Sequence, residues 1–312
     1  YHQNHNRIKT LSMQTLEKNI TNFLGNKGKS WLAALPNITK KLAKQWSLSN
    51  IQPIDNMSWN YVAKAVRNDN SPVVLKISCD EKLICSEVKA LQHFSGYGMV
   101  KLLSHNAEEH AVLLEQVLPG DSLCCIFPHR AEDVIDYYAA VVRQFISVPH
   151  PANDEFEHIS SWLVAIDNAD KSKFPEGLLE RALFLKNRLL ATSKNELLLH
   201  GDLHHDNILS DGKTCVAIDP KGVIGEIEFE VAWFDFIHDS ELHRHDIPIL
   251  FERRAKVLSD ALNINFQRLK DWVFVRLILS ACWMVENNDD PSMVIKQVKR
   301  ARNIIKQLRK KS

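Results

Sequence analysis

The residues best suited to chemistry lie in one stretch of the chain, between His200 and Asp219. An apolar run there leads into a polar turn that carries Asp202 and Asn207, and Asp219 follows twelve residues after Asn207. At this spacing one aspartate can take the proton of an acceptor hydroxyl, while an asparagine and a second aspartate hold magnesium over nucleotide phosphates. Phosphoryl transfer depends on charge neutralisation and in-line positioning, which such oxygen donors supply. We therefore predict that Asp202 is the catalytic base and that Asn207 and Asp219 bind magnesium.

Two other interpretations of this stretch remain open. Aspartate and asparagine are common turn residues, so the polar groups could simply form turns. Alternatively, a metal-dependent hydrolase could hold zinc with three histidines and a carboxylate, here His200, His204, His205 and Asp206. A separation of four residues between two of the histidines suits a helix, but the pattern of this segment is not helical. The zinc interpretation is therefore the weaker one.

A lysine and a glutamate earlier in the chain could contact the nucleotide. Lys76 lies in the apolar run 73–77, which is typical of a strand, and Glu87 lies in a segment with helical periodicity. An amine on such a strand can reach the α- and β-phosphates, and a nearby glutamate would orient it. Either residue alone is more often a surface charge. Together with the phosphotransfer spacing, they predict an ion pair at a nucleotide site.

The segments around this pair predict a small antiparallel sheet with one helix. The order is strand-strand-strand-helix-strand-strand over residues 51–118, with strands including 61–66, 73–77, 99–103 and 111–117 and a helix over about 82–94. Before it, residues 13–46 have helical periodicity, with interruptions expected at Gly25, Gly28 and Pro36. We assign residues 13–118 to an N-terminal nucleotide-binding lobe with leading helices.

Residues 119–312 are predicted to form a larger, mainly helical lobe that carries catalysis and acceptor binding. Helices are expected over 131–147, 178–190, 268–286 and 291–308, the last behind the capping candidates Asp289 and Asp290. A short β stretch, 197–218, interrupts them and contains a hairpin turn at 210–213. The fold class is α+β, with the boundary between the lobes near 118–120.

Composition excludes several classes of protein. With 39 basic and 38 acidic residues, the net charge of +1 gives no reason to expect a nucleic-acid partner. No apolar run approaches the roughly 20 residues of a membrane span, and the first residues lack the apolar core of a signal peptide. Six cysteines without a Cys-x-x-Cys pair are typical of reduced thiols, so we expect a cytoplasmic protein. Residues before Met13 are left out of the fold prediction, since Tyr1 cannot initiate translation.

Carboxylates crowd the segment that follows Asp219. They could be a solvated helical face with turn residues, or they could line a cleft that selects a polycationic acceptor. The residues concerned are Glu226, Glu228, Glu230, Asp235, Asp239 and Glu241.

The order of these motifs resembles the aminoglycoside phosphotransferase family, which has a protein-kinase-like bilobal fold. The segment Asp219-Pro-Lys221, with Gly225, Glu226 and Glu230 behind it, is similar to the branch of streptomycin 6-kinases and hydroxyurea phosphotransferases. The resemblance covers about residues 23–286. It implies ATP and magnesium as cofactors, Asp202 as the base, Asn207 and Asp219 as metal ligands, and Lys76 as a phosphate ligand.

The same resemblance places adenine against backbone groups near Gln116 and Leu118. The loop 56–60 would cover the phosphates with Ser58, although it contains no glycine, which normally lets backbone N–H groups approach phosphate. Streptomycin or a relative would be the acceptor, with Glu230, Asp235 and, from an opposite helix, Glu286 meeting its guanidinium groups. A kinase of a small metabolite, such as an amino alcohol or a sugar, is the main alternative, because the fold alone does not assign the substrate. A nucleotide-binding pseudokinase is less consistent with four intact functional positions.

Overall fold

The computed structural model describes residues 2–55, 57–151, 155–287 and 291–308, and it divides into two compact units, 1–120 and 121–312. The division falls two residues beyond the predicted end of the N-terminal lobe. The capping candidates Asp289 and Asp290 lie outside the described residues. Within the described part, no helix is long and apolar enough to cross a membrane.

The first unit begins with α1 (His2–Gln45), which consists of two helical segments joined at a kink. Gly25 has non-helical φ/ψ of 54° and −125°, so the helix kinks there as predicted. The interruptions expected at Gly28 and Pro36 are wrong. Pro36 lies inside the helix, where it removes one hydrogen bond without ending it. At Gly28 a Cβ would lie 2.5 Å from the carbonyl oxygen of Ile20, so glycine allows the turns on either side of the kink to approach closely.

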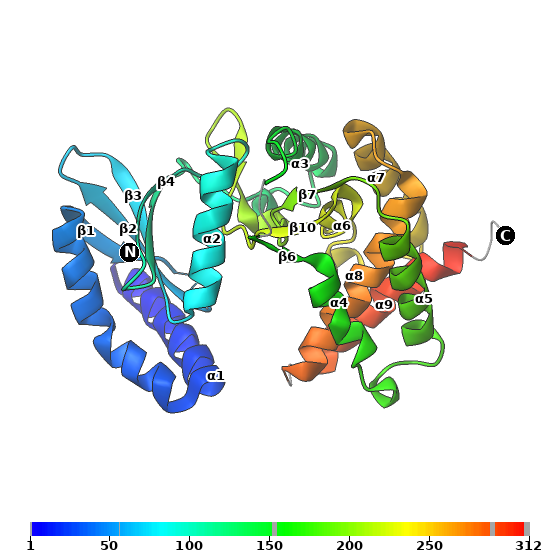
Figure 1. Ribbon diagram of the computed structural model, residues 1–312, viewed down its shortest axis with the longest axis horizontal. Helices are drawn as coiled ribbons and strands as arrows, with labels where there is room; N and C mark the ends of the chain where they lie inside the picture. The colour runs from blue at the N-terminus through cyan, green and yellow to red at the C-terminus, as the bar shows by residue number, and fades with distance from the viewer. Residues whose placement is uncertain (1, 56, 152–154, 288–290, 309–312) are drawn as a thin grey trace. The chain divides into compact units, whose positions relative to one another are not determined.

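The sheet of the first unit is five-stranded and antiparallel, in the order β1-β2-β3-β5-β4 (Figure 1). Its strands are β1 (Leu48–Pro53), β2 (Asn60–Arg67), β3 (Pro72–Ser78), β4 (Leu102–Asn106) and β5 (Ala111–Glu115). The strand predicted at 99–103 is shifted, because pairing with β5 begins only at Leu102. Central β3 is buried over most of its length, since α1 packs on the sheet through Leu16, Ile20 and Leu42 and α2 (Glu81–Phe94) contacts it through another apolar face.

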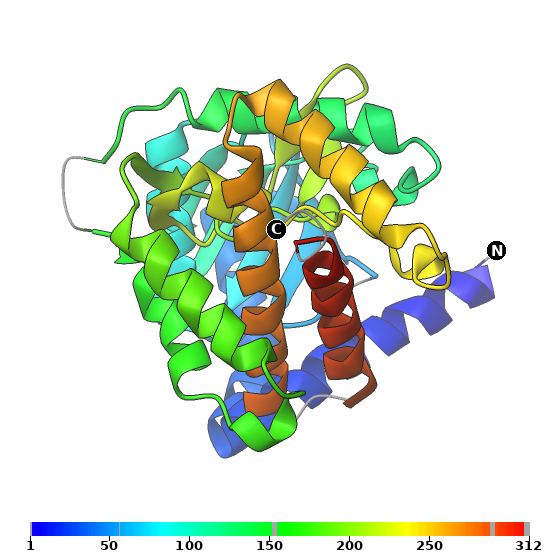
Figure 2. The same ribbon diagram turned by 90° about the vertical axis from the view of Figure 1, so that its right-hand side faces the viewer.

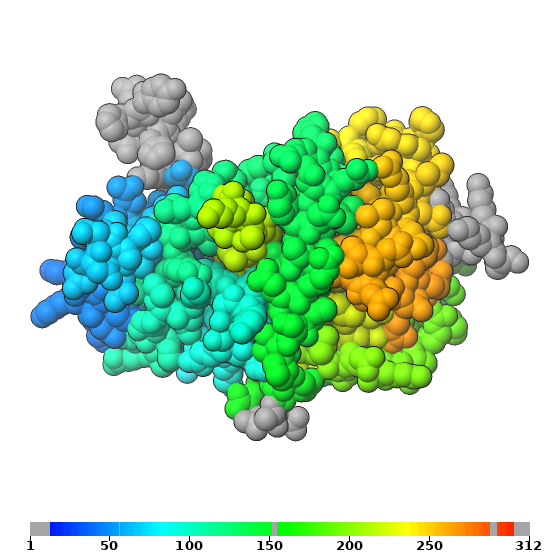
Figure 3. Space-filling view, turned by 90° about the horizontal axis from the view of Figure 1, so that it is seen from above, coloured from blue at the N-terminus to red at the C-terminus, as the bar shows by residue number. Residues whose placement is uncertain are grey.

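The second unit is mainly helical, as predicted. Its helices are α3 (Ala131–Phe145), α4 (Ile159–Asp167), α5 (Leu178–Ala191), α6 (Ile227–Val231), α7 (Ile247–Leu262), α8 (Phe266–Glu286) and α9 (Pro291–Leu308). Helix α8 is apolar on nearly all sides, and α4, α5, α6, α7 and α9 pack around it (Figure 2). Helix α3 packs beside α7 on the surface of this unit (Figure 3).

Short strands of the second unit bring distant segments together. The strands β6 (Glu157–His158), β10 (Val223–Glu226) and β7 (Glu196–Leu199) form one small sheet, and β8 (Ile208–Ser210) and β9 (Cys215–Ala217) form the predicted hairpin. Pairing of Val223 with Leu199 puts the start of β10 beside the end of β7. The segment that contains Asp219 therefore lies against the residues that follow β7.

Candidate active site

The predicted catalytic segment begins just after β7 with Gly201, a position where any other residue would be strained. Gly201 has a φ of +87°, and a Cβ there would lie 2.8 Å from the indole ring of Trp162. Left-handed backbone and a close neighbour both favour glycine. The turn at Gly201 directs the chain into the polar segment that begins with Asp202.

His200 joins the two halves of the site as a neutral residue. Its Nε2–H donates to the carbonyl oxygen of Ile218 at 2.8 Å, and its Nδ1 accepts from the backbone N–H of Asp202 at 3.1 Å. Burial lowers the pKa of His200 to about 4, so the ring is uncharged near neutral pH. Both ring nitrogens form hydrogen bonds, so a zinc ion could bind this histidine only by breaking one of them.

The other histidines give the zinc interpretation no more support. His205 is buried between Phe127 and Phe234, with ring centroids 4.4 and 4.5 Å away, and burial lowers its pKa to about 3. Among the described residues, no group of three or more histidine, cysteine, aspartate or glutamate side chains is arranged to hold a metal ion. The phosphotransfer interpretation fits this stretch better.

The carboxylate of Asp202 is partly exposed and has a defined orientation. The indole N–H of Trp233 donates to its Oδ1 at 2.8 Å, while Nε2 of His204 lies 3.9 Å from its Oδ2. The side chain of Asn207 donates to the backbone carbonyl of Asp202 at 2.9 Å. One carboxylate oxygen is thus held by an indole, and the other remains suited to accept a proton.

Asn207 and Asp219 supply hard oxygen donors on adjacent segments. The N–H of Ile218 donates to the carbonyl of Asn207 at 2.9 Å, which places Asp219 one residue beyond this contact. Because the amide nitrogen of Asn207 donates to Asp202, its side-chain oxygen is the atom available to a cation. Asp219 has a φ of +62° and an ion pair with Lys221 at 2.9 Å. Amide and carboxylate oxygens are the donors that magnesium prefers, so these residues fit the predicted ion.

Two buried ionisable side chains, Glu230 and Arg276, each hydrogen-bond the backbone where the catalytic segment begins. The N–H of Gly201 donates to Glu230 Oε2 at 2.8 Å, and the carbonyl of Gly201 accepts from Arg276 Nη2 at 3.1 Å. The guanidinium of Arg276 stacks on Phe229 and Trp233, 4.2 and 4.3 Å from their ring centroids. Burial raises the pKa of Glu230 to about 7 and lowers that of Arg276 to about 10.

This arrangement corrects the role predicted for Glu230. Its relative exposure is 0%, so its carboxylate cannot contact an acceptor in this conformation. It holds the turn that presents Asp202 instead. The sequence analysis also missed Trp233 and Arg276. The signal for Arg276 was available, because a single arginine within the apolar run 272–282 is a charge that must be buried with partners.

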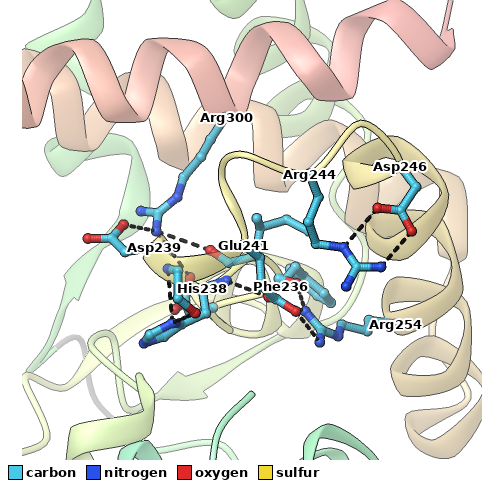
Figure 4. Close-up of polar contacts among 11 residues, drawn as sticks. Phe236, His238, Asp239, Glu241, Arg244, Asp246, Arg254 and Arg300 are labelled. Carbon is cyan, nitrogen blue, oxygen red and sulfur yellow. Dashed lines mark hydrogen bonds and ion pairs between the residues drawn. The ribbon is translucent and has the colours of Figure 1, made fainter. Parts of the chain in front are cut away.

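The predicted carboxylate-lined cleft is also wrong for most of its residues. Besides Glu230, four of the six carboxylates have internal partners, as Figure 4 shows for Glu241 and Asp239. Glu226 binds Arg268 through two hydrogen bonds, Glu228 accepts the N–H of Asn265, Glu241 binds Arg254 at 2.7 and 2.9 Å, and Asp239 binds Lys296 and Arg300. These carboxylates connect helices and turns within the unit.

Asp235 differs, because it lines a pocket. The pocket has a volume of about 190 Å³ and is lined mainly by apolar and aromatic residues of the segment 232–237 and of α7, α8 and α9. Its lining includes Trp233 and His204, the two side chains next to the carboxylate of Asp202. Burial raises the pKa of Asp235 to about 6. Glu286, the other predicted acceptor contact, is exposed at the end of α8 and is not among the residues that line this pocket.

In the first unit, the predicted ion pair of Lys76 and Glu87 is confirmed. The amine of Lys76 on β3 lies 2.6 Å from Glu87 Oε2 on α2, and both side chains are less than a tenth exposed. A buried pair of this kind fixes the position of the amine. Its contact with phosphate stays a prediction.

The other predicted nucleotide contacts lie at the edges of the first unit. Ser58 is exposed, and its carbonyl accepts from the side chain of Asn19 at 3.0 Å. The N–H of Gln116 donates to the carbonyl of Pro72 at 3.3 Å, and Leu118 is 52% exposed. Their contacts with adenine and phosphate also stay predictions.

Comparison with known proteins shows the family to which the chain belongs. A family described as aminoglycoside/hydroxyurea antibiotic resistance kinase matches residues 45–288. The streptomycin 6-kinase of Streptomyces glaucescens is 26% identical over 286 residues, which cover 86% of this chain and 90% of that protein. The streptomycin 3''-kinase of Klebsiella pneumoniae is 32% identical over 234 residues, which cover 70% of this chain and 82% of that protein.

The same fold occurs in solved structures of kinases. A thermostable mutant of the aminoglycoside phosphotransferase APH(4)-Ia, in a ternary complex with ADP and hygromycin B, has a TM-score of 0.61 at 14% identity, with 86% of this chain and 97% of that chain covered. Together these findings confirm the resemblance stated from the sequence and the protein-kinase-like fold.

Proposed function

Because the chain belongs to the family of aminoglycoside/hydroxyurea antibiotic resistance kinases, we propose that it transfers the γ-phosphoryl group of ATP to a hydroxyl of a streptomycin-like aminoglycoside. The chain is a small-molecule phosphotransferase, as its family and its relatives show. The observation that carries the proposed chemistry is the orientation of Asp202, whose carboxylate is held by Trp233 above a backbone fixed by Glu230 and Arg276.

In the proposed reaction Asp202 is the general base. Its Oδ2 accepts the hydroxyl proton as the acceptor oxygen forms a bond to the γ-phosphorus, and the bond from that phosphorus to the β-phosphate oxygen breaks. ADP leaves with the electron pair of that bond. The hydrogen bond from Trp233 to Oδ1 orients the carboxylate throughout, so that it meets the proton without further reorganisation.

The remaining proposed roles concern the phosphates. Asn207 and Asp219 would hold magnesium, which when bound neutralises the charge on the β- and γ-phosphates. Lys76, oriented by Glu87 at 2.6 Å, would contact the α- and β-phosphates. The proposal of ATP as donor is supported by the kinase fold and by the ADP in the complex of APH(4)-Ia.

Streptomycin is proposed as the acceptor on the names of the relatives. The names of two of them, streptomycin 6-kinase and streptomycin 3''-kinase, point to different positions on the antibiotic, so we leave open which hydroxyl is modified. A kinase of an amino alcohol or a sugar remains the second candidate, favoured by the small volume of the pocket near Asp202, about 190 Å³.

The test is a coupled assay of ADP release with streptomycin, other aminoglycosides and small amino alcohols as acceptors. We expect turnover with streptomycin that requires magnesium, and a loss of ~10²–10⁴-fold in kcat in Asp202→Asn, which removes the base but keeps the shape of the side chain. Mass spectrometry of the product should show one added phosphoryl group. Turnover restricted to small amino alcohols would favour the second candidate.

A further inference from the structure

The pocket beside Asp202 has the position of an acceptor site. Trp233 lines it, and the indole N–H of the same residue holds the carboxylate of Asp202 at 2.8 Å. His204 lines it as well and lies 3.9 Å from the second carboxylate oxygen. A molecule that fills this space therefore contacts two side chains that also lie beside the proposed base.

The walls of the pocket favour an apolar ring face. Trp233, Phe234, Phe236 and Phe251 are among its lining residues, together with aliphatic side chains of α7 and α8. Aromatic faces attract organic cations as well as apolar rings, because the ring quadrupole is negative above the plane. The volume of about 190 Å³ lies below the ~300–1,000 Å³ usual for drug-sized ligands. The pocket therefore has room for a single ring of an acceptor.

One carboxylate of the pocket lacks a hydrogen-bonding partner among the described residues. Asp235 is 34% exposed, and the cation nearest to it is Arg300, whose Nη2 lies 3.7 Å away, beyond hydrogen-bond distance. That nitrogen donates to Asp239 at 2.7 Å and to the carbonyl of Ile237 at 3.1 Å (Figure 4). Asp239 in turn has Lys296 as a second cation at 3.0 Å.

Asp235 is therefore the carboxylate of this segment that accepts no hydrogen bond from the described residues, and its contact with a cation is the ion pair of 3.7 Å with Arg300. The other five carboxylates of the segment 226–241 are bound by arginine, lysine or backbone N–H groups. Apart from the carboxylate of Asp202, a polycation would meet a single negative charge at this pocket, and its further charges would face Arg300 or apolar walls. Burying unpaired charge is costly, so this pocket does not select for high positive charge.

We propose, on the basis of the function proposed above, that this pocket recognises the acceptor through one cationic group, an ammonium or guanidinium carried by a single ring, which pairs with Asp235 while the ring lies against the aromatic walls. The class of acceptor that this pocket selects is a ring that carries one cationic group and a hydroxyl within reach of Asp202. For a streptomycin-like acceptor, only one of its guanidinium groups occupies the pocket.

The first test compares two variants that remove the same charge. Asp235→Asn should raise the Michaelis constant for streptomycin by at least ~10-fold, which corresponds to about 1.4 kcal/mol, while the Michaelis constant for ATP stays within about twofold. Asp260→Asn is the matched control, because Asp260 is an exposed aspartate of α7 that pairs with Lys256. The control should leave both constants unchanged.

The second test measures binding without phosphoryl transfer. Isothermal titration calorimetry of the full chain would compare a monoamino cyclitol with inositol, its neutral counterpart. In the wild type the amine should bind at least ~10-fold more tightly than inositol, and Asp235→Asn should abolish this difference. For a polyammonium aminoglycoside without guanidinium groups, Asp235→Asn should weaken binding by no more than it does for the monoamino cyclitol.

The outcomes separate the two proposals. If the wild type phosphorylates streptomycin but Asp235→Asn changes neither the Michaelis constant nor the amine preference, the pocket proposal is overturned and the function stands. If no acceptor is phosphorylated but the amine preference depends on Asp235, the pocket proposal holds and the function is wrong. Much tighter binding of a polyammonium compound to both proteins would also overturn the single-cation proposal.

Discussion

Replacement of Trp233 by phenylalanine tests whether the indole N–H orients the proposed base. The variant keeps an aromatic ring over Arg276 and in the pocket wall, but it removes the hydrogen bond of 2.8 Å to Asp202 Oδ1. Hydrogen bonds to charged groups contribute about 1.5–3 kcal/mol. The Asp202 side chain is 30% exposed, so water replaces part of the lost bond and the lower end of that range applies. We expect kcat to fall ~10-fold, since 1.4 kcal/mol is a factor of ten in rate.

The assay is steady-state ADP release with saturating ATP and streptomycin. Because the ring remains in place, both Michaelis constants should stay within about threefold, so the loss should be in kcat. Trp283→Phe is the control: this tryptophan of α8 packs against Trp162 at 6.1 Å and does not line the pocket. A kcat for Trp233→Phe within twofold of wild type, in a folded protein with unchanged melting temperature, would refute the orienting role.

A spectroscopic measurement follows the same bond without turnover. The indole N–H resonance that is lost in Trp233→Phe identifies the cross-peak of Trp233 in a ¹H–¹⁵N spectrum. In Asp202→Asn this cross-peak should move upfield, because an amide oxygen is a weaker acceptor than a carboxylate. Asp206→Asn, at an exposed position of the same segment, should leave it in place.

Three further predictions concern the metal, the buried ion pair and pH. Asp219→Ala should weaken magnesium-dependent ATP binding measured by calorimetry, while binding of the nucleotide without magnesium changes little. Lys76→Met should lower the free energy of unfolding by about 3–5 kcal/mol in denaturant titrations, because it leaves Glu87 charged and buried. Since the pKa of Asp235 is raised to about 6, the carboxylate is charged above that pH and becomes protonated below it. The Michaelis constant for a cationic acceptor should therefore rise ~10-fold between pH 7.5 and pH 5, and Asp235→Asn should remove this dependence.

The sequence predicted the elements and residues whose signals are local. The helices at 82–94, 268–286 and 291–308 were predicted within two residues of their observed bounds, because apolar periodicity and capping residues lie within each segment. The pair of Lys76 and Glu87 was also predictable, since a strand and the next helix place both side chains by their own periodicities. The phosphotransfer roles of Asp202, Asn207 and Asp219 were predicted because their spacing lies within one short stretch, and these roles stay predictions.

The partners of the carboxylates were not predictable in this way. Glu230 reaches Gly201 across 29 residues, and Glu226 reaches Arg268 across 42. A carboxylate that binds a ligand and one that is buried against a distant arginine have the same local sequence pattern. Burial decides between them, and burial depends on packing around α8 rather than on neighbours in the chain. The interruption predicted at Pro36 failed for a similar reason, because packing of α1 on the sheet outweighs the lost hydrogen bond.

Glu230 and Asp235 have different positions in the structure, and this difference affects how a kinase of this kind could change its acceptor. Glu230 and Arg276 each hydrogen-bond the backbone of Gly201, and a change at either residue leaves a buried polar group of this turn without its partner. Such changes damage catalysis for every acceptor alike. Asp235 is partly exposed, and its ion pair of 3.7 Å with Arg300 is too long for a hydrogen bond, so its replacement removes no hydrogen bond from the catalytic segment. Specificity can therefore vary at the pocket while the geometry of Asp202 is preserved. Substitution of Asp235 should redirect the enzyme to other acceptors at little cost in turnover, whereas Phe234, Phe236 and Phe251 are buried core residues whose substitution would also affect the fold.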